Sequence, residues 1–121
     1  MTQMWSTLWL IAAMSLATFA TAGMRAEEAP KRIHLIIRGR VQGVGFRAFT
    51  VEEAQKRKLR GWVRNLRSGN EVELVAEGEG KSIGEFIERV KVGPIGSKVE
   101  KVEEKPPPEG DLPKFEERPT Q

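Results

Sequence analysis

The chain has 121 residues, 31% of them charged, and its 20 lysines and arginines outnumber 17 aspartates and glutamates to give a formal charge of +3. This composition is typical of one small globular domain. The absence of cysteine excludes disulfide frameworks and thiolate metal sites, and the single histidine, His34, excludes metal motifs built on two histidines.

The N-terminal segment differs from the rest of the chain. The first 23 residues carry no charged side chain and are largely apolar. Ala20-Thr21-Ala22 has the small-x-small pattern that a signal peptidase cleaves, which places the cut before Gly23. We therefore predict a signal peptide or membrane-targeting segment over residues 1–23, a linker over 24–30 and a folded domain over 31–119.

Two alternatives to cleavage remain open. Lysine and arginine are missing from the start of the segment, and serine and threonine interrupt its apolar stretch. A segment that is retained would anchor the protein in a membrane, and only through residues 1–23. Translation from Met24 would give an ordinary cytoplasmic N-terminus instead. The preferred prediction is export, to the periplasm or out of the cell.

The folded part begins with a strand, a loop and a helix. Ile33, Leu35 and Ile37 alternate with other residues at the period of two that is typical of a strand. A glycine-rich loop follows over residues 39–45. Phenylalanines at helical spacing and charge pairs at (i, i+4) then predict a helix over residues 46–58.

A hairpin and a second helix come next. Two strand-like segments, 61–65 and 72–76, flank turn residues at 67–70, which predicts a hairpin. Apolar residues at i, i+3, i+4 and i+7 then predict a second helix. Ser82 and Glu85 form a capping-box pattern at its start, and Gly93-Pro94 ends it.

Two shorter segments, 99–102 and 115–118, are expected to form a fourth strand and a last edge strand. The resulting order is βαββαβ. This order favours an α+β fold, the ferredoxin-like sandwich, in which an antiparallel sheet carries both helices on one face.

The loop before the first helix has the features of an anion site. It leads into a helix N-terminus, where unpaired backbone N–H groups and the helix dipole favour anions. Its three glycines allow successive N–H groups to converge on one phosphate. Arg47 brings a guanidinium fork that can bind two phosphate oxygens. The alternative interpretation is a glycine turn chosen for packing, with Arg47 merely solvated.

Two segments resemble the signatures of one family. Gly39-Arg40-Val41-Gln42-Gly43-Val44-Gly45-Phe46-Arg47 is similar to the acylphosphatase signature, and Gly61-Trp62-Val63-Arg64-Asn65 resembles the second signature of that family. The resemblance extends from Lys31 to Arg118. Two signatures at the family's spacing are far more specific than either glycine motif alone.

The resemblance implies hydrolysis of acyl phosphates to a carboxylate and inorganic phosphate, without metal, cofactor or covalent intermediate. It implies that Asn65 places the attacking water and that Arg47 binds phosphate. The phosphate-binding segment that it implies comprises Gln42, Gly43, Val44, Gly45, Phe46 and Arg47. The expected partners are a small acyl-phosphate substrate and inorganic phosphate as product, with no nucleic acid, and the expected state is a monomer.

This chemistry suits the residues of the chain. The leaving carboxylate has a conjugate acid with a pKa near ~4, so no general acid is needed at neutral pH. The remaining task is to hold the phosphoryl group, neutralise its charge and orient water in line. An arginine, a ring of backbone N–H groups and one amide side chain can do this.

Three further expectations concern single residues. His34 is expected to be exposed or half-buried, and Trp62 is expected to pack beneath the site. The hairpin is one residue longer than is usual in the family, which suggests a β-bulge near Asn70.

The alternative function is a non-catalytic ferredoxin-like module that binds RNA or another anion. The basic run from Lys56 to Arg60 is its main support. RNA-binding sheets of this topology display aromatic side chains on their central strands, and the sequence has no such stripe.

Overall fold

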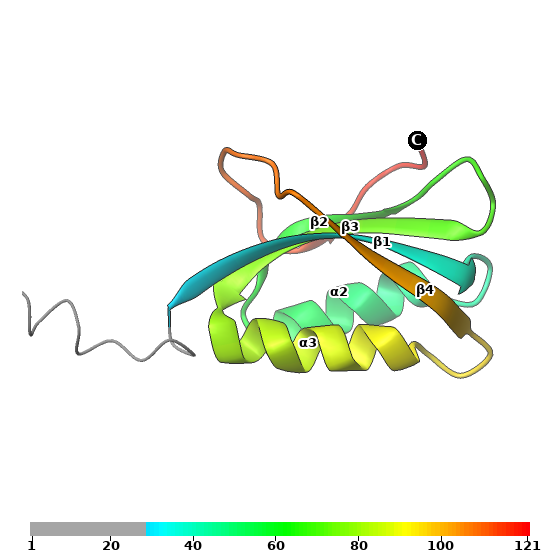
Figure 1. The fold of residues 1–121 in the computed structure, drawn as a ribbon, viewed down its shortest axis with the longest axis horizontal. Coiled ribbons are helices and arrows are strands. Elements are labelled where there is room, and N and C mark those ends of the chain that lie inside the picture. Colours follow the sequence, from blue (N-terminus) through cyan, green and yellow to red (C-terminus); the bar gives the residue numbers. More distant parts are fainter. Residues whose placement is uncertain (1–28) are drawn as a thin grey trace, which may run out of the picture.

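The computed structural model describes residues 29–121, which form a five-stranded sheet covered on one face by two helices (Figure 1). The predicted segment 1–23 and nearly all of the linker lie outside this part of the chain. The elements are, in chain order, β1 (Pro30–Arg40), α2 (Phe46–Lys56), β2 (Arg60–Asn65), β3 (Glu71–Glu79), α3 (Gly80–Val92), β4 (Lys98–Lys105) and β5 (Glu116–Glu117).

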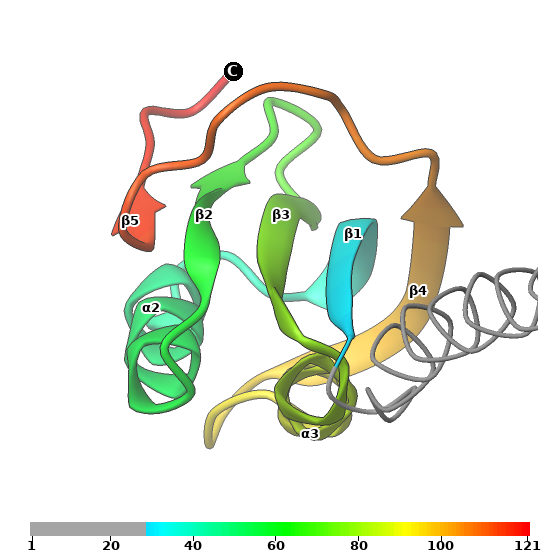
Figure 2. The same cartoon turned by 90° about the vertical axis from the view of Figure 1, so that its left-hand side faces the viewer.

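The strand order is β4-β1-β3-β2-β5. All pairs among the four longer strands are antiparallel, while the short β5 runs parallel to β2. Figure 2 looks along the sheet and shows α2 beneath β2 and β5, with α3 beneath β3 and β1. The predicted ferredoxin-like α+β sandwich is therefore confirmed, with one parallel pair added at the edge.

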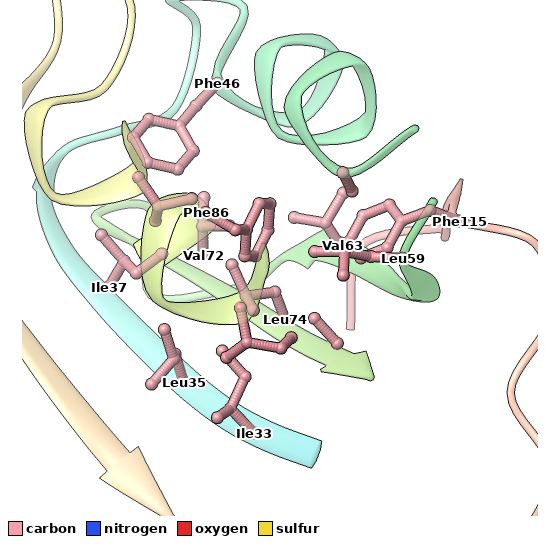
Figure 3. Packing of buried hydrophobic residues seen from close by; sticks show 14 of the residues in the cluster. Ile33, Leu35, Ile37, Phe46, Leu59, Val63, Val72, Leu74, Phe86 and Phe115 are labelled. Atoms are coloured by element: carbon pink, nitrogen blue, oxygen red, sulfur yellow. The ribbon is translucent and has the colours of Figure 1, made fainter. Parts of the chain in front are cut away.

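The core lies between the sheet and the helices, as the alternation in β1 predicts. Ile33, Leu35 and Ile37 all point into it and are at most 2% exposed. Figure 3 shows them packed with aromatic rings from three other segments. The rings of Phe86 and Phe115 meet edge to face, with centroids 5.9 Å apart, so the last part of the chain is fastened to α3.

The C-terminal end of α2 and the N-terminal end of α3 differ from the sequence prediction. Helix α2 ends at Lys56, two residues early, because Lys58 turns to a positive φ of 57° and the Leu59 N–H donates back to the Ala54 carbonyl. Helix α3 begins at Gly80, so Ser82 lies inside its first turn. The capping box predicted for Ser82 is wrong, since the N-cap is Glu79 and no side chain among residues 29–121 caps this helix.

The bulge predicted near Asn70 is also wrong. The pairing of β2 with β3 runs without a shift to Asn65↔Val72. The register shift occurs instead between β1 and β4, at Arg38/Gly39. Gly39 has a φ of 141°, and a Cβ there would lie 2.0 Å from the Lys98 carbonyl oxygen, so only glycine fits this contact.

The sheet face away from the helices carries a second, small apolar cluster. Trp62 packs there against Val75 and Leu112. The guanidinium groups of Arg64 and Arg118 lie 4.7 and 5.0 Å from the centre of its ring. Trp62 therefore does not pack beneath the loop site as expected. His34 is half-buried, as predicted, with its Nε2 2.8 Å from Glu73.

Within residues 29–121, no helix has the length and apolar character needed to cross a membrane.

Candidate active site

A pocket of about 220 Å³ lies where the loop after β1, the end of β2 and the edge strand β5 meet. It is lined by Val41, Gly43, Gly45, Phe46, Arg47, Ala48, Asn65 and Glu117. The two predicted catalytic residues, Arg47 and Asn65, are 18 positions apart in sequence and share this pocket because α2 and β2 pack together.

The backbone of the loop depends on its glycines. Gly43 and Gly45 have φ values of 74° and 76°, in the left-handed region that residues with a side chain rarely adopt. A Cβ at either position would meet nothing within 4 Å. Glycine is therefore required at these two positions by the left-handed backbone conformation and not by a lack of space.

Gly45 is also the N-cap of α2, and no side-chain hydrogen bond caps the helix. The Phe49 N–H donates to the Gly45 carbonyl at 3.0 Å and begins the helical ladder. In the described part of the chain no side chain caps the first turn of α2, and the pocket is bounded by a helix N-terminus that favours an anion.

Arg47 stands in the first turn of α2 with its side chain 39% exposed. Its Nε lies 3.7 Å from a carboxylate oxygen of Glu117, which is longer than a hydrogen bond. Within residues 29–121 this ion pair is the only polar contact of the guanidinium, which makes no hydrogen bond to the protein. The guanidinium fork is thus available to an anion in the pocket.

Asn65 is the last residue of β2. Its Oδ1 atom is buried and accepts no hydrogen bond from any group in residues 29–121. Buried polar atoms are nearly always paired, so an unpaired amide oxygen on a residue that lines a pocket marks a place where a ligand or water binds.

Two of the predicted phosphate-binding residues direct their side chains elsewhere. The Gln42 Nε2 donates to the carbonyls of Leu66 and Glu71, at 2.7 and 2.8 Å, and so fastens the loop to the β2–β3 hairpin. Val44 packs against the core. Neither residue lines the pocket, whereas Gly43, Gly45, Phe46 and Arg47 do.

Sequence reasoning missed Val41, Ala48 and Glu117 as lining residues. Glu117 reaches the pocket only because β5 pairs in parallel with β2, at Val63↔Glu117. A two-residue strand leaves no periodic signal from which this pairing could be read. Among residues 29–121, no group of three or more metal-binding side chains is close enough to hold an ion.

Comparisons with known proteins point to one family. The family model described as Acylphosphatase matches residues 33–116. An acylphosphatase from a Synechococcus strain is 48% identical over 89 residues, which cover 74% of this chain and 94% of that protein.

Solved structures of acylphosphatases are also similar to this chain. An acylphosphatase from Coxiella burnetii is 38% identical, with a TM-score of 0.69 over 76% of this chain and 96% of that one. An acylphosphatase from Bacillus subtilis is 43% identical, with a TM-score of 0.63 over 74% of this chain and 99% of that one. With a family match over more than half of its length and relatives matched almost end to end, the chain belongs to the acylphosphatase family.

Proposed function

We propose that the protein hydrolyses acyl phosphates in this pocket. The loop amides and Arg47 hold the phosphoryl group, and Asn65 orients the attacking water. The observation that carries the proposal is the meeting of the Arg47 guanidinium, a helix N-terminus and an Asn65 Oδ1 with no partner in residues 29–121 around one pocket of about 220 Å³.

In this proposal the phosphoryl group is bound by the positive charge of Arg47 and by the backbone N–H groups at the start of α2. The phosphoryl group of an acyl phosphate carries negative charge on its equatorial oxygens, and that charge must stay neutralised as the bond breaks. The Arg47 fork can take two of these oxygens, and the first amides of α2 can take another. The amide donors are fixed by the loop and the helix before substrate binds, so little reorganisation of the backbone accompanies the reaction.

Water placement rests on Asn65. Its Oδ1 is a hydrogen-bond acceptor without a partner in residues 29–121, and a water that donates to it is held at the pocket wall. The water then attacks phosphorus, the P–O bond to the acyl group breaks, and the electron pair leaves with the carboxylate. An oxygen of the phosphoryl group accepts the proton from the water, so no side-chain base is used.

The proposed reaction needs neither a metal nor a cofactor. A carboxylate is a good leaving group because its conjugate acid has a pKa near ~4, so no Lewis acid or general acid has to stabilise it. The positive charge for the phosphoryl oxygens comes from Arg47 and the helix N-terminus.

The test is turnover by the purified protein. Acetyl phosphate is incubated with the protein in the presence of a chelator, and phosphate release is compared with that from an alkyl phosphomonoester. The proposal expects rapid, chelator-resistant release from the acyl phosphate and little from the monoester, whose alkoxide is a poor leaving group. No release from acetyl phosphate, or equal release from both compounds, would refute it.

The RNA-binding alternative is not favoured. The sheet face on which bases would stack carries Trp62, a residue that is only 8% exposed beneath its neighbours. Phe46, Phe86 and Phe115 are buried in the core on the helix side. In the part of the chain that the structure describes, no open aromatic platform lies on the sheet.

A further inference from the structure

The C-terminal tail, residues 118–121, continues the pairing of β5 along β2. The Arg118 N–H donates to the Val63 carbonyl at 2.8 Å, and the Gln121 N–H donates to the Asn65 carbonyl at 3.2 Å. The Arg67 N–H in turn donates to the Gln121 carbonyl at 3.1 Å. Figure 2 shows the tail leaving β5 and running beside β2 to the C-terminus.

Side chains on the open face of the sheet hold the tail in this path. The Arg118 guanidinium lies over the Trp62 ring at 5.0 Å. Arg64 donates to the side-chain oxygen of Gln121 and is itself fixed by Glu73, at 2.7 Å from its Nε. The tail is therefore bound at both ends, through backbone and side chains, although Pro119, Thr120 and Gln121 are exposed.

These contacts fall on the strand end that carries Asn65. Side chains alternate along a strand, so Trp62 and Arg64 face the open side, and Val63 and Asn65 face the helices and the pocket. On one edge, Asn65 is paired with Val72 of β3. On the other edge, its carbonyl is held by Gln121. The tail thus holds the backbone of Asn65 at the edge of β2 opposite to β3, and the Asn65 side chain projects from this backbone.

We propose that the C-terminal tail is a positioning element for the Asn65 amide, with the Gln121 backbone N–H as its contact. The inference rests on the proposed function, in which Asn65 orients water. Within residues 29–121, the tail makes no hydrogen bond or ion pair to the loop after β1 or to Arg47. Its loss should therefore affect turnover and leave phosphate binding unchanged.

The test uses two variants of the tail. Gln121→Pro removes the backbone N–H that donates to the Asn65 carbonyl, and a chain that ends at Arg118 removes all contacts of Gln121 while it keeps β5 and the contacts of Arg118. Thr120→Ala is the matched control, because Thr120 is an exposed tail residue outside these contacts. For each protein, kcat with acetyl phosphate and the inhibition constant of inorganic phosphate are measured, and each tail change is repeated in an Asn65→Ala background.

The expected result is a fall in kcat of about threefold to tenfold in both tail variants, since small displacements of a positioned group slow a reaction strongly. The phosphate inhibition constant and the Thr120→Ala control should stay at the parent values. In the Asn65→Ala background the tail changes should have no further effect on kcat, because the side chain that they position is gone.

An unchanged kcat in both tail variants would overturn the inference, as would an equal fall in kcat in the Asn65→Ala background. Loss of phosphate binding in parallel with kcat would overturn it too, since this would indicate a general disturbance of the pocket. A different result bears on the proposed function. If Asn65→Ala alone retains parental kcat, then Asn65 does not orient water, whatever the tail does.

Discussion

Arg47 is the residue whose geometry matters most for binding. Arg47→Lys keeps the positive charge but replaces a planar fork with a point charge, which cannot take two phosphate oxygens side by side. We expect kcat/KM for an acyl phosphate to fall roughly tenfold or more, with an unchanged melting temperature, because Arg47 is half-exposed and lies outside the core.

Arg40→Lys is the control for this variant. Arg40 is exposed at the end of β1 and does not line the pocket. Steady-state kinetics of the two variants should therefore differ. Parental kcat/KM in Arg47→Lys would remove Arg47 from the site.

Glu117 places a negative charge in a pocket proposed to bind an anion. Its carboxylate lies 3.7 Å from Arg47 Nε, so it competes with phosphate for the same positive charge. Because both side chains are partly exposed, the contact is worth less than about 1 kcal/mol. Glu117→Gln should therefore lower the inhibition constant of inorganic phosphate by about twofold to fivefold.

Glu116 provides the matched control, since it is the other residue of β5, is equally exposed and contacts Arg118 instead. Glu116→Gln should leave the inhibition constant of phosphate nearly unchanged. Weaker phosphate binding in Glu117→Gln would mean that Glu117 holds Arg47 in place and does not compete with the ligand.

At the scale of elements, the two helices are joined by a buried carboxylate. Glu53 of α2 is 5% exposed and lies 2.7 Å from Arg57, the residue that follows α2, and 3.4 Å from Arg89 of α3. Burial raises the pKa of Glu53, but the hydrogen bond from Arg57 and the charges of Lys56, Arg89 and Arg57 outweigh it, so that the pKa lies below its usual range.

A lowered folded-state pKa means that the ionised Glu53 stabilises the fold above the ordinary glutamate pKa. This contribution disappears as the pH falls through the lowered value. Glu53→Gln should therefore reduce the free energy of unfolding by about 2 kcal/mol at neutral pH, and the difference from the parent should shrink in acid.

Urea unfolding at several pH values checks this, with the neighbouring Glu52→Gln as control, because Glu52 is exposed and its one ion pair within residues 29–121 is with Lys56. A difference between Glu53→Gln and the parent that stays constant down to acidic pH would contradict the assignment.

Elements with clear periodicity could be predicted from the sequence, whereas contacts between distant segments could not. The alternation in β1 and the apolar spacing in α3 locate both elements, because burial on one face imposes the period. The start of α3 differs from the start that the capping-box pattern predicts. The first N–H of the helix, that of Gly80, donates to the Ala29 carbonyl, a partner far away in sequence.

The same distinction applies to the site. Arg47, Asn65 and the loop glycines could be named because motif and helix chemistry are local. Glu117 and the contact of Gln121 with Asn65 could not, because both depend on how a two-residue strand docks beside β2. The pairing of so short a strand depends on tertiary packing, which leaves no recognisable pattern in the sequence.

At the scale of the whole molecule, the predicted export of the protein concerns residues outside the described fold. We propose that the chain is cleaved before Gly23, after Ala20-Thr21-Ala22. N-terminal sequencing of the native protein should then give Gly23 as the first residue. Met1 retained in the membrane fraction would indicate an anchor, and a soluble protein that starts at Met24 would contradict export.

The central claim for the whole molecule is that one pocket divides its work, with phosphate held by the loop and Arg47 and water oriented by Asn65. The most direct test measures kcat and the inhibition constant of inorganic phosphate for Asn65→Ala. The account predicts that kcat falls by about 100-fold or more, while the inhibition constant stays within about twofold of the parent. A parallel loss of phosphate affinity would show that Asn65 binds phosphate, and would contradict the account.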